Sequence, residues 1–152
     1  MLNRPSESPE KLSDKEKLKD VQNFVKDMNE IGFEQGDRSI NQGNTKLKIE
    51  SVRGDGGSFV KLNLIKNGKE VFVYDMHASM FHQENGEDRP VGVTMKIDGK
   101  TMSYSGDENN EHGIYNNYHL LEGAKKHQKE ILSMIEIDNN KRKEAKLKKE
   151  IK

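Results

Sequence analysis

The first regular pattern in the chain is helical. Apolar residues at helical spacing follow a capping box, in which Ser13 and Glu16 can satisfy each other's free backbone N–H groups. The stripe consists of Leu18, Val21, Val25 and Met28. Gly32 follows between two apolar neighbours, as is typical of a glycine that ends a helix. The pattern predicts a helix over about residues 13–32, followed by a loop over residues 34–44.

A second helical stripe lies near the end of the chain and predicts a helix over about residues 115–137. Its apolar positions are Leu120, Leu121, Ala124, Ile131, Leu132 and Ile135. Asp138 interrupts the stripe, and residues 141–152 then carry seven basic and two acidic side chains. We interpret this segment as a solvated tail, with nucleic-acid binding as the alternative.

Between the two helices the apolar period changes from about 3.6 to 2, which indicates strands. Three dipeptides, Asp55-Gly56, Asn67-Gly68 and Asp98-Gly99, tolerate the positive φ angles that tight hairpin turns require. Strands are therefore predicted at residues 45–53, 58–66, 69–76, 91–97 and 100–105.

Closing the hairpins about these turns fixes which residues pair. The first turn pairs Leu47 with Leu64, the second pairs Leu64 with Val71, and the third pairs Met95 with Met102. The first two turns agree on one apolar face, which consists of Leu47, Ile49, Val60, Leu62, Leu64, Val71 and Val73.

The element order is helix, three strands, a long connection, two strands and helix. It predicts an α+β fold with a five-stranded antiparallel sheet, flanked by an N-terminal and a longer C-terminal helix on one face. This order resembles that of the small homodimeric chaperones of bacterial type III secretion systems, which have a short helix between the third and fourth strands. The resemblance covers residues 13–137 and implies protein binding by a homodimer.

Composition limits the domain organisation. Of 152 residues, 31% are hydrophobic and 34% are charged, so we expect one folded domain over residues 13–138, a disordered leader over 1–12 and a basic tail over 139–152. The chain has no cysteine, which excludes disulfides and thiolate chemistry. It also has no long apolar run, so a cytoplasmic location is expected.

Acidic and histidine side chains collect in the loops that the predicted topology places at one end of the sheet. They are Asp55, Asp75, His77, His82, Glu84, Glu87, Asp88, Asp107, Glu108, Glu111 and His112. Such oxygen and imidazole groups can bind divalent metals, and Asp75 on the core face could act as a general base. The spacing fits no standard metal motif. We therefore assign no catalytic residue, metal or cofactor and keep a metal-dependent hydrolase as the alternative function.

The predicted register also places large apolar side chains on the face of the sheet away from the helices. These are Val52, Phe59, Phe72, Tyr74 and Met76. A sheet face without helices is normally polar, so these groups require cover by the long loop, a second copy or a partner protein. The sequence thus favours a non-enzymatic bacterial accessory or adaptor protein that binds another protein through this face.

Overall fold

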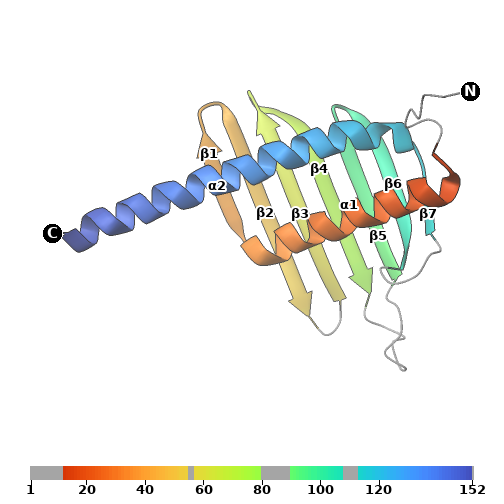
Figure 1. Cartoon of the computed structure of the whole chain (residues 1–152), viewed down its shortest axis with the longest axis horizontal. Helices are drawn as coiled ribbons and strands as arrows, with labels where there is room; N and C mark the ends of the chain where they lie inside the picture. Colours follow the sequence, from red (N-terminus) through yellow and green to blue (C-terminus); the bar gives the residue numbers. More distant parts are fainter. Residues whose placement is uncertain (1–11, 55–56, 80–89, 108–112, 152) are drawn as a thin grey trace, which may run out of the picture.

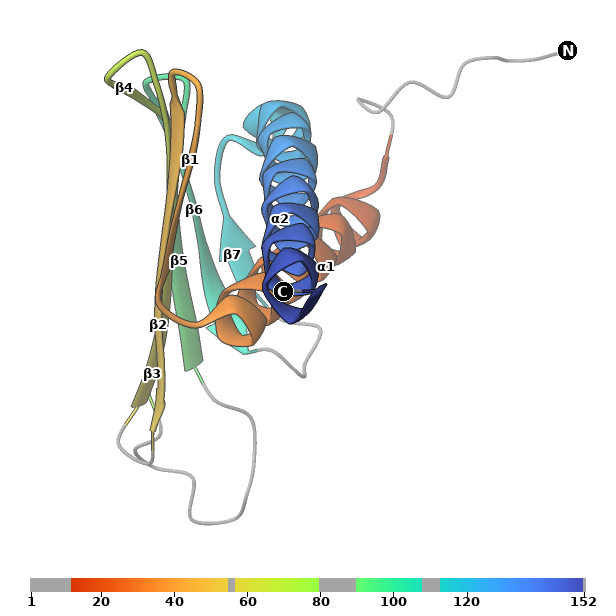
Figure 2. The same cartoon turned by 90° about the vertical axis from the view of Figure 1, so that its left-hand side faces the viewer.

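The computed structural model describes residues 12–54, 57–79, 90–107 and 113–151. These residues form two layers, with both helices on one face of an antiparallel sheet, as Figures 1 and 2 show. The helices are α1 (Asp14–Gln35) and α2 (Leu121–Ile151), and a 3₁₀ turn, η2 (Tyr118–Leu120), precedes α2. The α+β architecture with N- and C-terminal helices is confirmed.

The sheet has seven strands, not five, and each strand pairs with its neighbours in the sequence. They are β1 (Arg38–Gln42), β2 (Thr45–Gly54), β3 (Gly57–Lys66), β4 (Lys69–Ser79), β5 (Pro90–Ile97), β6 (Lys100–Asp107) and β7 (Gly113–Tyr115). The two extra strands are the short edge strands β1 and β7. In β1 only Ile40 is buried, and β7 has three residues, so neither gives the alternation that reveals a strand in sequence.

Two of the three predicted hairpin registers are confirmed. Leu47 pairs with Leu64 across β2 and β3, and Met95 pairs with Met102 across β5 and β6. The prediction for β3 and β4 is wrong beyond the first two pairs after the turn. Ile65 pairs with Glu70, but Leu64 pairs with Phe72, because a β-bulge adds one residue to β4.

The bulge reverses the two faces of β4. An insertion of one residue moves every following side chain to the opposite side of the sheet, because side chains alternate with a period of two. Phe72, Tyr74 and Met76 consequently lie in the core beneath the helices, whereas Val73 and Asp75 lie on the other face.

The start of α1 follows the sequence prediction, but its end does not. The Glu16 N–H donates to Ser13 Oγ at 3.1 Å and the Ser13 N–H donates to Glu16 Oε1 at 3.0 Å, which completes the capping box. The helix continues past Gly32 to Gln35 and ends at Gly36, which has a φ of 64°. Gly32 is instead a packing residue, since a Cβ there would overlap Cγ1 of Val60 on β3.

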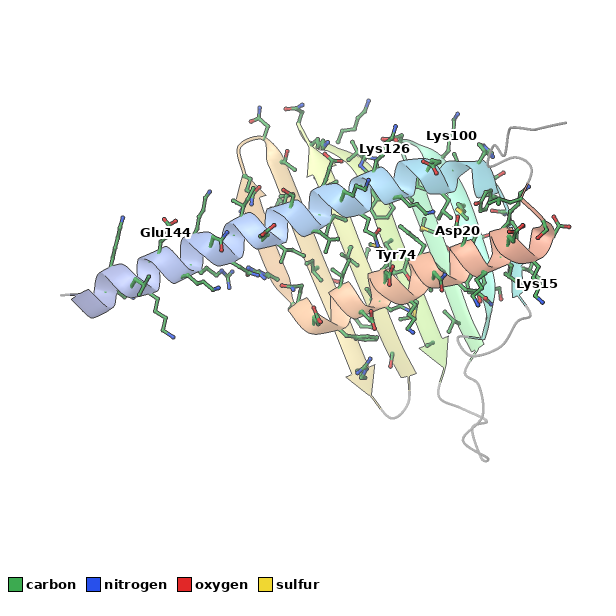
Figure 3. The ribbon with its side chains drawn as sticks, in the orientation of Figure 1. Lys15, Asp20, Tyr74, Lys100, Lys126 and Glu144 are labelled. Atoms are coloured by element: carbon green, nitrogen blue, oxygen red, sulfur yellow. The ribbon has the colours of Figure 1, made fainter. Side chains whose placement is uncertain are left out.

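Polar contacts join the two helices and fix Tyr74 in the core. The Tyr118 hydroxyl donates to Asp20 at 2.7 Å, and Lys125 pairs with the same carboxylate at 2.9 Å. Burial, followed by the hydrogen bond to Asp20, raises the pKa of Tyr118 to about 12. Below α1, the Tyr74 hydroxyl donates to Asn29 Oδ1 at 2.7 Å; in the view of Figure 3, Tyr74 lies next to this helix.

Two further clusters attach α2 to the turns and edge of the sheet. His127 lies between Asp98, at 3.1 Å, and Glu130, at 2.8 Å, and Glu130 also pairs with Lys66. Partial burial raises the pKa of Glu130, but its hydrogen bonds to Lys66 and His127 outweigh burial, so the net pKa is lowered. Arg38 on β1 donates to Asp138 at 2.6 Å near the point where α2 leaves the sheet.

Beyond Asp138 the helix continues without the sheet. Residues 139–149 are all exposed, and Figure 1 shows this part of α2 extending past β1. The basic tail predicted from the sequence is thus helical as far as the structure describes it. Within the described residues, no helix combines the length and apolar character needed to cross a membrane.

Candidate functional site

The face of the sheet opposite the helices, here called the outer face, is the candidate site. Figure 2 shows α1 and α2 stacked on one side of the sheet, and no described helix or strand lies on the other side. A sheet covered on one face only normally exposes polar residues on its second face. Residues on the outer face that depart from this rule therefore indicate where the face could contact another molecule.

Only two of the five residues predicted to form a binding patch lie on the outer face. Val52 is 51% exposed there, and Phe59 beside it is half-buried. Phe72, Tyr74 and Met76 are 0%, 0% and 1% exposed, so the prediction that they point outward is wrong. The cause is the bulge in β4, which the hairpin turn at Asn67-Gly68 does not reveal.

The structure defines a different line of residues, here called the outer row. It crosses six strands through consecutive register pairs and consists of Val52, Phe59, His77, Gly92, Ser105 and Ile114. The rings of Phe59 and His77 lie 6.5 Å apart, and Ile114 at the far end is 76% exposed. The outer row therefore has an apolar group at each end. The sequence did not indicate Ile114, because β7 itself was not predicted.

Gly92 lies near the middle of the outer row, and no feature of the described residues requires glycine there. It pairs regularly with His77 on one side and Ser105 on the other, so it marks no bulge. Its φ is not positive, and a Cβ at this position would meet no atom of the described residues within 4 Å. Glycine inside a strand lowers stability, and it commonly marks a place where another backbone or a ligand approaches closely. The described part of the fold has room for a larger residue here and does not explain the glycine.

The row next to the outer row is polar and of mixed charge. It crosses five strands through Glu50, Lys61, Asp75, Thr94 and Ser103. Asp75 was predicted to face the core as a possible general base. That prediction is wrong because the bulge in β4 places Asp75 on the outer face. Its Oδ1 lies 3.0 Å from His77 Nε2, and both side chains are open to solvent.

The predicted acidic end of the sheet lies mostly outside the described residues. Only Asp75 and His77 have described side chains, and they belong to the outer face. The others lie where the structure gives no side-chain description: Asp55, His82, Glu84, Glu87, Asp88, Asp107, Glu108, Glu111 and His112. Among the described residues, no three histidine or carboxylate side chains gather in a way that could hold a metal. The metal-dependent hydrolase stays a prediction.

Comparison of the chain with protein-family models, with curated proteins and with solved structures gives no match. Its function must therefore be argued from the outer face and the rest of the molecule alone.

Proposed function

We propose that this chain is a non-enzymatic protein-binding module that binds another polypeptide through its outer face. The observation that carries the proposal is Gly92, an exposed mid-strand glycine that the fold does not require. A segment of the partner that lies close to the sheet at Gly92 accounts for the missing side chain. Phe59 and Ile114 then contact the partner on either side of this gap.

The size of the outer face fits a stable interface. The seven strands contain 55 residues, and each residue covers roughly 15 Å² of the sheet plane, given the rise per residue and the spacing between strands. The resulting area of about 800 Å² matches the contribution of one partner to a standard protein interface. The face bears both signs of charge, so the partner should present a surface of mixed charge rather than a strongly acidic or basic one.

The proposal is narrower than the resemblance to secretion chaperones. Those chaperones have five strands, whereas this sheet is a meander of seven. We therefore propose binding of a partner protein and attach no chaperone action to it.

Filling the gap at Gly92 should separate binding from stability. Gly92→Thr is expected to leave the free energy of unfolding unchanged or to raise it by up to about 1 kcal/mol, because threonine favours strands and has open space here. The same change should weaken partner binding at least about tenfold, because the new side chain occupies the partner's place. Urea unfolding and titration of the purified partner measure the two effects.

The partner can be found by site-specific cross-linking. A photoreactive phenylalanine analogue at Ser105, beside Gly92, should cross-link the partner in extracts of cells that express the chain. The same analogue at Lys126, which lies on α2 on the helix side in Figure 3, is the control and should not. Cross-links from Lys126 alone, or full binding by Gly92→Thr, would contradict the proposal. A self-cross-link with a dimer mass by light scattering would identify the occupant as a second copy instead.

A further inference from the structure

A stripe of exposed residues, here called the α2 stripe, runs along α2 from the domain into the part of the helix that leaves the sheet. Apart from two adjacent asparagines at its middle, its members are three or four residues apart, which places them on one side of the helix. They are Leu132, Glu136, Asn139, Asn140, Lys143 and Leu147. All are exposed, and the two leucines are 47% and 58% exposed. The α2 stripe thus has a leucine at each end and polar groups between.

Most of the α2 stripe lines a groove between α2 and the end of α1. The groove has a volume of about 400 Å³, and α1 contributes Ile31, Glu34 and Gln35 to its lining. Because α1 ends at Gln35, the projecting part of α2 continues past Asp138 for about 16 Å with every residue exposed up to residue 149 (Figure 1). A short helical segment without tertiary contacts gains little stability by itself, so a second surface beside it would stabilise it.

The groove and the projecting part of α2 carry complementary charges. Glu34 and Glu136 lie at the groove, whereas residues 139–149 carry six basic side chains and one acidic side chain. Glu136 and Lys143 are about 10 Å apart along the helix axis, too far to pair with each other. Neither forms an ion pair with a described residue. Both charges are therefore available to another molecule.

The α2 stripe is complementary to itself when two copies run in opposite directions. In an antiparallel pair of α2 helices centred between Asn139 and Asn140, Leu132 of one copy lies opposite Leu147 of the second copy. Glu136 lies opposite Lys143 in the same arrangement, and the asparagines lie opposite each other. Each of these contacts occurs twice, because a two-fold axis relates the copies, and such self-complementarity is what a symmetric dimer requires.

We propose that the chain forms a two-fold symmetric dimer in which the projecting part of α2 from each copy lies in the groove of the other copy. This dimer goes beyond the proposed function, because it uses the helix side of the molecule and leaves the outer face of each copy free. The contact spans about 23 Å between Leu132 and Leu147, which is shorter than a standard interface. We therefore expect a dissociation constant between about 1 and 100 µM.

Charge reversal on the α2 stripe tests the pairing, and sedimentation equilibrium of the full chain from about 5 to 500 µM measures it. Glu136→Lys and Lys143→Glu each place like charges opposite one another, so each variant alone should dimerise at least about tenfold more weakly. An equimolar mixture of the two variants should associate about as tightly as the native chain, because each variant supplies the charge that the other requires. Circular dichroism checks that both variants keep their helix content.

Lys141→Glu is the matched control. Lys141 belongs to the projecting part of α2 but is three or four residues from no member of the α2 stripe, so its reversal should leave the dissociation constant unchanged. The proposal is overturned if the native chain stays monomeric up to about 500 µM, if mixing does not restore the dimer, or if Lys141→Glu weakens it as much as Lys143→Glu. A dimer that is lost in Gly92→Thr but kept in both stripe variants would form through the outer face. That result would overturn the α2 pairing and leave the proposed function standing.

Discussion

Replacing Phe72 with alanine is expected to lower the free energy of unfolding by about 3–5 kcal/mol, whereas the same change at Phe59 should cost roughly 1 kcal/mol. The two phenylalanines lie on adjacent strands but on opposite faces of the sheet. Phe72 is fully buried, and its ring stacks on His127 with the centroids 5.6 Å apart. Phe59 lies on the outer face, where water already reaches it. Urea unfolding of both variants measures the difference.

This pair of variants tests the β-bulge directly. Without the bulge, Phe72 would share the outer face with Phe59, and the two changes would cost similar amounts. A loss of about 3 kcal/mol or more at Phe72 alone supports the register of the structure. Equal losses, or a larger loss at Phe59, would mean that β4 pairs with β3 in the register expected from the turn.

Gly32→Ala is expected to destabilise the domain by about 2 kcal/mol, although alanine favours helices over glycine by about 1 kcal/mol. The added Cβ would overlap Val60 Cγ1, and it would lie 3.0 Å from Cγ2 and 3.2 Å from Cβ of the same residue. Rotation of the valine side chain cannot relieve all three contacts, because its Cβ does not move. Helix α1 would therefore have to shift away from β3. Thermal or urea unfolding measures the loss.

A double-mutant cycle isolates this contact. In a Val60→Ala background both methyl groups are absent, so Gly32→Ala should cost little or nothing further. Gly92→Ala is the matched control, because it adds the same methyl group where no atom of the described chain lies within 4 Å. If Gly32→Ala is neutral in the native background, or if Val60→Ala does not rescue it, α1 does not pack on β3 as the structure shows.

The elements with strong local signals could be predicted from the sequence. The capping box identified the start of α1, and the turns about residues 55 and 98 gave the correct pairing of β2 with β3 and of β5 with β6. In these hairpins the turn chemistry and the apolar alternation specify the same register. The edge strands β1 and β7 were missed because they contain too few residues for alternation to be seen.

The candidate site could not be predicted, because β4 gives no alternation to read. In the segment Val71–Met76 five of the six residues are apolar, so either face of the strand could be the buried one. The turn then favours the register without a bulge. That register would place Phe72, Tyr74 and Met76 on the outer face and their neighbours in the core. Gly32 presents a similar ambiguity, since a glycine near a helix end can serve as a cap or as a packing residue. Only the position of Val60 distinguishes the two.

The central claim is that the outer face is bare in the free chain and available to a partner. Paramagnetic relaxation by a soluble gadolinium chelate tests it most directly, because the chelate broadens NMR signals only of groups that it can approach. The methyl groups of Val52 and Ile114 and the Hα atoms of Gly92 should broaden strongly, while the methyl groups of Val91 and Val93 on the helix side should not. Protection of Gly92 and Val52 to the same extent as Val93 would show that the outer face is already covered, and would contradict the account.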